Sequence, residues 1–143
     1  MNSGIEFAQK INLAYNSICK PLLRKLNLPQ TAFDILMFLA NNPEYTTARD
    51  IVEIRKIKAN LVSVNVDKLV ADGYIIRKET AGDRRKTQLI CTPAAKKIIE
   101  EGSALQKKFL EHLFDNMDTA KKEAFLTGMK QIENNLDKIL EKK

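Results

Sequence analysis

Apolar residues recur at helical spacing over most of this chain. In the first segment they are 4, 3, 4 and 4 residues apart (Phe7, Ile11, Ala14, Ile18 and Leu22), which describes one face of a helix. Pro21 lies inside the pattern and is expected to kink this helix, because proline lacks an amide donor and crowds the preceding turn. A second helix is predicted from Pro29 to Asn41, with its inward positions at Phe33, Leu36, Met37 and either Leu39 or Ala40.

Two shorter helices are predicted to follow. Thr46 or Thr47 can cap the first, whose apolar side is expected to carry Ile51, Val52 and Ile54. After a break over residues 56–58, the second runs to about Asp72, where Gly73 supplies the usual C-terminal stop. Its apolar positions recur at 4 and 3 residues (Val62, Val66 and Leu69).

The periodicity changes after Gly73. Residues 74–78 and 87–91 are rich in β-branched and apolar side chains, and the polar stretch 79–86 between them contains Gly82, so a β-hairpin with a charged tip is predicted. Thr92 and Pro93 then predict a helix start, with a hydroxyl cap and proline in the first helical position.

Two long amphipathic helices complete the pattern. The first carries Ala95, Ile98, Gly102, Leu105, Phe109 and Leu113; the second, capped by Asp118, carries Phe125, Met129, Ile132, Leu136 and Ile139. The order predicts a mainly α fold with a small β-hairpin wing: a winged helix-turn-helix over residues 28–92, with residues 1–27 and 93–143 as dimerisation helices. One chain leaves these long helices few partners, so we expect their apolar faces to pack against a second copy.

Positive charge is concentrated in the middle of the chain. The chain has 24 basic and 18 acidic residues; twelve of the basic and six of the acidic ones lie between Arg49 and Lys97, so the whole excess of +6 falls there. A basic segment between balanced ones indicates a polyanion-binding module. The alternative is a solvated charged surface.

Composition argues against several other classes. The chain is 44% apolar and 29% charged, its apolar runs are too short to span a bilayer, and its first residues do not form a secretory signal, so a cytoplasmic protein without membrane partners is expected. Cys19 and Cys91 suggest neither a disulfide framework nor a zinc site. Glycine-rich phosphate loops, nucleophile elbows and metal-ligand motifs are missing, and His112 is interpreted as a surface or interface residue. We therefore expect no enzyme, metal or cofactor.

The predicted fourth helix has a polar outer face suited to DNA. By its period, the outward residues are Lys58, Ala59, Asn60, Ser63, Val64 and Asp67. A helix fits the major groove, where Asn60 could read adenine, Ser63 a base or phosphate, and Ala59 or Val64 a thymine methyl. Asp67 is expected to hold a neighbouring basic side chain.

The hairpin tip carries Asp83-Arg84-Arg85-Lys86. Three cations on a protruding loop add little to stability, because an exposed ion pair contributes roughly 0–1 kcal/mol. Guanidinium groups suit a narrow, negative minor groove, so we interpret this tip as a DNA contact. The alternative is a solvated turn.

Several motifs together resemble the MarR family of bacterial and archaeal transcription regulators. They are Leu28, Phe33 and Leu36; Thr47-Ala48-Arg49-Asp50-Ile51; Val62 and Val66-Asp67-Lys68-Leu69; Gly73-Tyr74-Ile75; Asp83-Arg84-Arg85; Leu89 and Thr92; and Leu113-Phe114 with Met117. The resemblance implies a homodimer with intertwined first, fifth and sixth helices that binds palindromic operators. It also implies a role that is usually repression, often relieved by a small phenolic or carboxylic ligand or by cysteine oxidation. In the family pattern, the position of Arg85 enters the minor groove and that of Asp83 braces it.

Three positions depart from the family pattern. Lys58 stands where Ser or Thr usually begins the recognition helix, which weakens the cap but adds a phosphate contact. Asn65 occupies a usually apolar position, so its amide needs a partner. Ala95 replaces a common glycine.

Cys19 is a candidate sensor. It follows Tyr15 by four residues on the first helix, and some MarR relatives sense peroxides through a first-helix cysteine aided by tyrosine hydroxyls. A reactive thiol needs a lowered pKa, for which Lys20, Arg24 and Lys25 are near in sequence. The alternative for Cys19 is a small buried hydrophobe, and Cys91, at a strand end, is expected in the core. A winged-helix protein-interaction module that has abandoned DNA is the remaining alternative for the chain.

Overall fold

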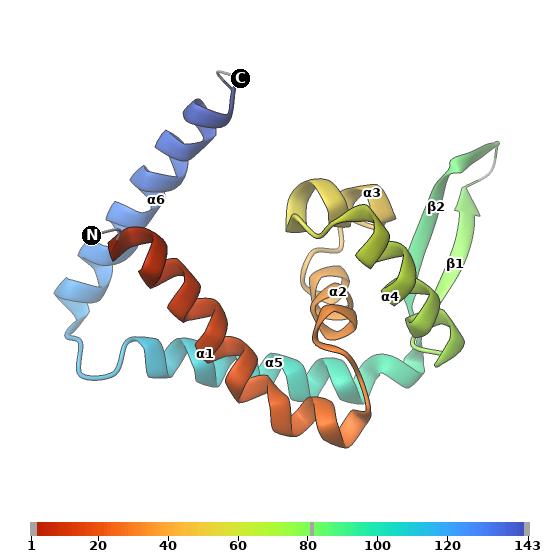
Figure 1. Cartoon of the computed structure of the whole chain (residues 1–143), viewed down its shortest axis with the longest axis horizontal. Coiled ribbons are helices and arrows are strands. Elements are labelled where there is room, and N and C mark those ends of the chain that lie inside the picture. Colours follow the sequence, from red (N-terminus) through yellow and green to blue (C-terminus); the bar gives the residue numbers. More distant parts are fainter. Residues whose placement is uncertain (1–2, 81, 142–143) are drawn as a thin grey trace. The chain divides into compact units, whose positions relative to one another are not determined.

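The computed structural model describes residues 3–80 and 82–141, except for the side chains of residues 3 and 83–85. These residues form a predominantly helical fold with one antiparallel hairpin, as predicted (Figure 1). The helices are α1 (Ser3–Leu26), α2 (Gln30–Asn41), α3 (Ala48–Asp50), the π-helix η1 (Ile51–Arg55), α4 (Ala59–Ala71), the 3-10 helix η2 (Pro93–Ala95), α5 (Lys96–Leu113) and α6 (Thr119–Glu141). The strands are β1 (Ile75–Thr80) and β2 (Asp83–Cys91), and we call this hairpin the wing. The chain divides into two compact units, residues 1–107 and 108–143.

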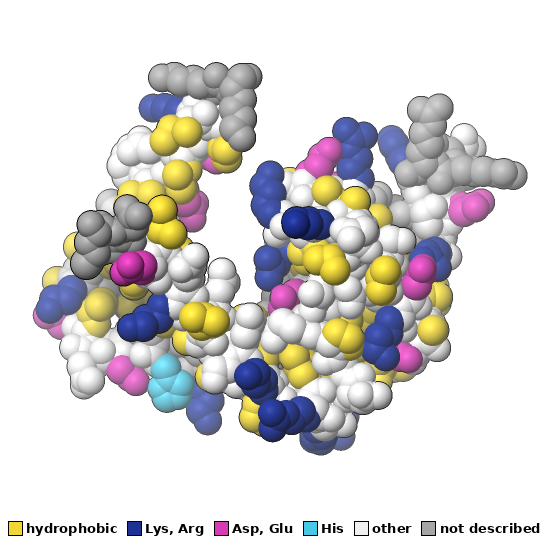
Figure 2. All heavy atoms as spheres, in the orientation of Figure 1, with side chains coloured by type: hydrophobic (Ala, Val, Ile, Leu, Met, Phe, Trp, Pro, Cys, Tyr) yellow, Lys and Arg dark blue, Asp and Glu magenta, His cyan; other side chains and the backbone are white. Residues whose placement is uncertain are grey.

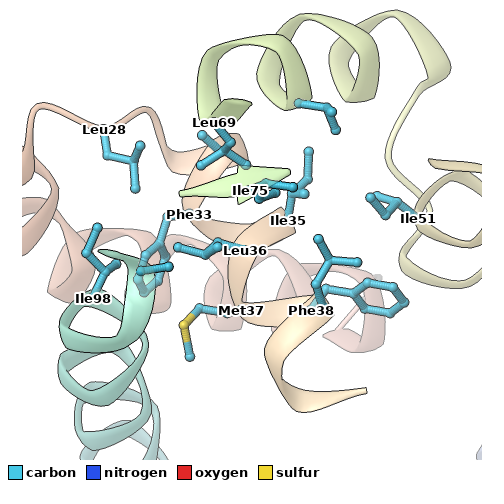
Figure 3. Close-up of a cluster of buried hydrophobic side chains, with 14 of the residues drawn as sticks. Leu28, Phe33, Ile35, Leu36, Met37, Phe38, Ile51, Leu69, Ile75 and Ile98 are labelled. Atoms are coloured by element: carbon cyan, nitrogen blue, oxygen red, sulfur yellow. The ribbon is translucent and has the colours of Figure 1, made fainter. Parts of the chain in front are cut away.

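The core of the first unit is built around α2. Phe33, Ile35 and Leu36 of α2 are fully buried, and Met37 and Leu39 are nearly so, which confirms the inward positions predicted for this helix. Figure 3 shows side chains from other elements gathered around them: Ile51 of η1, Leu69 of α4, Ile75 of β1 and Ile98 of α5. Because α2 is apolar on several sides, it can pack against four elements at once and hold α4 and the wing in place.

The predicted apolar face of α1 is largely uncovered in the single chain. The helix forms as expected and continues through Pro21, but Phe7 and Ile18 are 54% and 37% exposed. The α1 side chains buried in the core are Cys19 and Leu23 instead. The other elements of this unit therefore do not cover the predicted apolar face of α1, and a partner would be required to bury it.

The start of α3 follows the expected capping chemistry. Thr47 is the N-cap: its hydroxyl accepts a hydrogen bond from the Asp50 amide at 3.1 Å, and Asp50 Oδ2 accepts from the Thr47 amide at 3.1 Å. The helix then widens into η1, where Ile51 is buried and Val52 is half-buried. The expected burial of Ile54 was wrong, because it is 48% exposed. A π-turn takes more residues than an α-turn, so the third residue after Ile51 does not return to the buried face.

Helix α4 confirms its predicted period and ends. Val62, Val66 and Leu69 are buried, and Gly73 has the positive φ of 83° expected just beyond a helix end. Lys58 is the N-cap and makes no side-chain capping bond, in agreement with the weakened cap. The buried amide of Asn65 has the partner it needs, since Nδ2 donates to the Leu61 carbonyl at 2.8 Å.

The wing strands are longer than predicted, and this corrects the description of its tip. Thr80 pairs with Asp83 and Glu79 with Thr87, so the backbone of residues 84–86 lies in β2 as a bulge rather than in a loop. A hydrogen bond from the Thr80 hydroxyl to the Lys86 carbonyl (2.6 Å) joins the strands beside the bulge. The sequence showed no apolar positions here, because both faces of a strand at the far end of a hairpin can be solvated.

The two last long helices begin where predicted, although one cap differs. Thr92 precedes η2 with Pro93 in the first helical position, but its hydroxyl donates to the Gly73 carbonyl at 2.6 Å and makes no capping bond. The tertiary contact with the turn after α4 thus replaces the local one. Asp118 does cap α6, since its Oδ1 accepts from the Lys121 amide at 2.7 Å.

The expected inward face of α5 is only partly covered. Ala95, Ile98 and Gly102 are buried and Leu105 and Phe109 are half-buried, whereas Leu113 is 42% exposed. Coverage thus declines along the helix toward its C-terminal end.

Candidate nucleic-acid interface

The outer face of α4 has the composition and exposure that DNA contact requires. All six positions predicted to point outward are exposed: Lys58, Ala59, Asn60, Ser63, Val64 and Asp67. Val64 is 66% exposed, which is unusual for a valine in the middle of a helix whose opposite face is core. The structure therefore brings these candidate residues together on one solvent-facing surface.

The turn before α4 is cationic and is linked to α2 by an ion pair. Lys56 adopts a left-handed conformation with φ 65°, and Lys56 and Lys58 are both exposed at the N-terminal end of α4. Arg55, just before them, lies 3.6 Å from Asp34 Oδ2 of α2. Burial raises the pKa of Asp34, against the opposing effects of its Gln30 hydrogen bond and of Arg55. This mostly buried carboxylate ties the turn to the central helix.

A groove of about 410 Å³ separates α4 from α3 and the wing. Its polar lining includes Arg49, Ser63, Arg77 and Thr87, and its apolar lining is Ala48, Val52, Ala59, Val62, Val66 and Leu89. Arg49 is exposed and hydrogen-bonds Glu53 at 2.8 Å, which raises the pKa of its guanidinium. Residues from the middle of α4 and from the base of the wing therefore line the same groove.

Asp67 of α4 is paired, as expected of an acidic residue on this face. Its Oδ1 accepts a hydrogen bond from Nη2 of Arg77 on β1. Sequence reasoning anticipated a basic partner but did not identify Arg77. No periodic spacing links a helix to the strand that follows it, so the sequence offered no signal for that choice.

The cationic run of the wing is only partly within the described residues. Lys86 is exposed, and its backbone is held by Thr80. The side chains of Asp83, Arg84 and Arg85 lie outside the described residues, so the minor-groove and bracing roles expected of Arg85 and Asp83 stay predictions. On the face shown in Figure 2, other Lys and Arg side chains gather over α3, η1 and the wing.

The candidate sensor residues lie in a different part of the first unit. The Tyr15 hydroxyl accepts a hydrogen bond from Gln106 Nε2 at 2.9 Å, and Gln106 Oε1 accepts from Asn41 Nδ2 at 3.1 Å. These three residues, with Asp34, Met37, Phe38, Asn42 and Arg55, line a hollow of about 230 Å³. Burial raises the pKa of Tyr15 to about 12.

Cys19 is fully buried beside Tyr15 in the core. Burial raises the pKa of its thiol, and the cations near it in sequence do not produce the lowered pKa that reactivity needs. Cys91 ends β2 and is half-buried, so it packs against the core and not inside it as expected, and burial raises the pKa of its thiol. These observations favour structural roles for both cysteines.

The described residues contain no group of three or more His, Cys, Asp or Glu side chains placed to hold a metal ion. His112 is exposed on α5, with Nδ1 3.2 Å from Asp115 Oδ2. Over the same residues, no helix has both the length and the apolarity needed to cross a bilayer.

Comparisons with known proteins agree with this geometry. Residues 26–86 match the profile of the MarR family. A MarR protein from Peptoclostridium difficile is 20% identical, with 96% of this chain and 89% of that chain covered and a TM-score of 0.83. A protein from Listeria monocytogenes assigned to the MarR family of transcriptional regulators, solved with a 26-mer DNA, is 19% identical with 95% and 90% covered and a TM-score of 0.83. A MarR transcriptional regulator from Methanosarcina mazei Go1 is 19% identical, with 97% and 93% covered and a TM-score of 0.80. No curated protein matches the sequence.

Proposed function

We propose that this chain, whose residues 26–86 match the MarR family profile and whose fold is that of solved MarR proteins, is a sequence-specific, DNA-binding transcriptional regulator. In this proposal it acts as a homodimer that represses by binding palindromic operators. The observation that carries it is the exposed polar face of α4 beside a wing with three consecutive cations, in the segment that holds the whole charge excess. A helix fits the major groove, and a β-hairpin beside it can reach the neighbouring minor groove.

Each candidate residue has a defined part in the complex. Helix α4 would enter the major groove, with Asn60 on adenine, Ser63 on a base or phosphate, and the methyl groups of Ala59 or Val64 against thymine. Lys58 would contact a phosphate at the start of the helix. In the wing, Arg84 and Lys86 would contact the backbone, while Arg85 enters the minor groove and Asp83 braces it.

The proposed homodimer uses residues 1–27 and 93–143 as dimerisation helices and residues 28–92 as the DNA-binding domain. Its support is the exposed apolar stripes of α1 and α6, which each unit leaves uncovered. Two-fold symmetry would set the two α4 helices roughly 34–36 Å apart, one turn of DNA, and so explain a palindromic operator.

Release from the operator is assigned to a small phenolic or carboxylic effector. The hollow beside Tyr15 supports this, because Arg55 and the amides of Asn41 and Gln106 line it together with Met37 and Phe38. The alternative of a redox switch at Cys19 is not favoured, since that thiol is buried with a raised pKa.

The wing assignment is tested with Arg85→Ala. We expect about a tenfold to hundredfold loss of affinity for the duplex that the wild-type protein enriches from a random-sequence pool, the range for one well-placed base contact. The fold should persist by circular dichroism. Wild-type affinity should fall with salt at a log–log slope of about −0.9 per neutralised phosphate.

Lys130→Ala is the matched control, because it removes the same charge from an exposed position on α6 outside the basic segment. Its affinity should stay near that of the wild type. Equal losses in both variants would mean that net charge, not the wing, drives binding. Failure of the wild-type protein to shift any duplex at low salt would favour a winged-helix protein-interaction module instead.

A further inference from the structure

An ion pair joins the outer face of α4 to the wing. Asp67 and Arg77 are ten residues apart and lie on either side of the turn at Gly73. Their side chains are 66% and 44% exposed. A pair this solvated contributes roughly 0–1 kcal/mol to stability, so folding alone does not explain an acidic residue on a surface that would meet phosphates.

The position of the pair along the wing suggests what it does. β1 is buried only at Ile75, and the five residues that follow are exposed. Arg77 pairs in register with Leu89 of β2, which is buried and whose amide donates to the Thr46 carbonyl at 2.7 Å. Arg77 and Leu89 therefore form the rung at which both strands are still attached to the body of the first unit.

Beyond this rung the wing acts as a lever. Residues 84–86 bulge between the Glu79–Thr87 and Thr80–Asp83 pairs, two and three rungs beyond Arg77–Leu89, which at about 3.3 Å per residue is roughly 7–10 Å further out. A tilt of about 10° at the rung would move these residues by roughly 1–2 Å, which is enough to break a hydrogen bond. A small change at Arg77 would thus displace all three cations from their phosphates.

We propose that Asp67 and Arg77 are positioning residues that set the angle of the wing against α4. Their pairing keeps the wing cations in register with the major-groove face of α4 on one DNA molecule. This inference rests on the proposed function, which supplies the DNA. Asp67 acts through Arg77 and does not contact the bases.

The sign of the effect of Asp67→Asn separates positioning from electrostatics. The substitution removes one negative charge and nearly preserves the side chain's shape, so electrostatics alone predicts tighter DNA binding. Positioning predicts about tenfold weaker binding to the duplex enriched by the wild-type protein, the size of a coupling between contacting side chains. An unrelated duplex of equal length should be affected less, because non-specific binding does not need the two elements in register.

Two further variants complete the comparison. Glu79→Gln removes a negative charge from the same exposed stretch of β1, and we expect unchanged or slightly tighter binding. The exchanged pair Asp67→Arg with Arg77→Asp should bind within about threefold of the wild type, whereas each single reversal should bind at least about tenfold more weakly. Asp67→Asn binding as tightly as the wild type would overturn the proposal.

Hydrogen exchange in the free protein provides a readout that needs no DNA. Amides of residues 76–80 should exchange faster in Asp67→Asn and Arg77→Ala, while those of residues 62–69 in α4 keep their protection. Unchanged exchange in β1 would overturn the anchoring. If the wild-type protein binds no duplex, the proposed function and the DNA part of this inference both fail, and the exchange measurement alone decides whether the pair anchors the wing.

Discussion

At the scale of single residues, Thr47 and Asp50 define where the helix-turn-helix begins. Asp50 Oδ2 accepts hydrogen bonds from the amides of Thr46 and Thr47, at 3.0 and 3.1 Å, while the Thr47 hydroxyl accepts from the Asp50 amide. These bonds satisfy amides that a helix start otherwise leaves unpaired. Because α3 changes into a π-turn after only three residues, this reciprocal cap is a large part of its local stabilisation.

Thr47→Ala should lower the free energy of unfolding by about 1 kcal/mol, since it removes the hydroxyl half of the cap. Urea denaturation at fixed protein concentration measures this loss. Thr46→Ala is the control, because the Thr46 contact with Asp50 uses the backbone amide and survives the change. A loss at Thr46 equal to that at Thr47 would contradict the cap assignment.

At the scale of elements, the packing of α5 against α2 depends on Gly102. A Cβ added there would lie 2.6 Å from Met37 Sδ and 3.0 Å from two ring carbons of Phe33. Both of those side chains are buried in the core, so they can move only by displacing their neighbours. Gly128 on α6 has nothing within 4 Å of the same position and provides a comparison in open space.

Gly102→Ala and Gly128→Ala should therefore change stability in opposite directions. At Gly128 the gain in helix propensity should stabilise the protein by up to about 1 kcal/mol. At Gly102 overpacking costs about 1–3 kcal/mol and should exceed the same gain, for a net loss. Thermal unfolding at one protein concentration compares them, and stabilisation by both would show that α5 does not pack tightly on α2.

At the scale of the whole molecule, the most prominent feature is an apolar face of α6 that is exposed to solvent. Phe125, Met129, Ile132, Leu136 and Ile139 recur along α6 and are all exposed, with Ile132 at 59% and Leu136 at 51%. Hydrophobic side chains are visible along this helix in Figure 2. Contiguous apolar surface of this kind marks a site of association, which is why we assign α6 to the proposed homodimer.

Ile132→Glu should shift the protein from dimer to monomer by at least about tenfold in dissociation constant, because burying one such side chain contributes about 1.5–3 kcal/mol. Analytical ultracentrifugation over a concentration series measures the shift. Asn134→Glu adds the same charge at an exposed polar position of α6 and should leave association unchanged. A wild-type protein that is monomeric at all concentrations would remove the basis for the homodimer.

The sequence by itself determined the order and type of the elements, because periodicity and caps are local properties. The 4 and 3 spacing of Val62, Val66 and Leu69 identified both faces of α4. The whole charge excess falls in the segment that folds into α3, η1, α4 and the wing. What failed at this level was the length of the wing strands, because the polar residues 79–80 and 83–86 look like a loop, and the placement of Ile54, which a π-turn rotates outward.

Only the tertiary structure decided which groups became partners. In the folded chain the Thr92 hydroxyl donates to the Gly73 carbonyl and Arg77 pairs with Asp67. Burial of Cys19 raises the pKa of its thiol. Each outcome depends on residues that are distant in sequence but close in space, and on the desolvation that packing imposes. Local sequence carries no record of either, because both exist only once α1, α2, α4 and the wing have come together around one core.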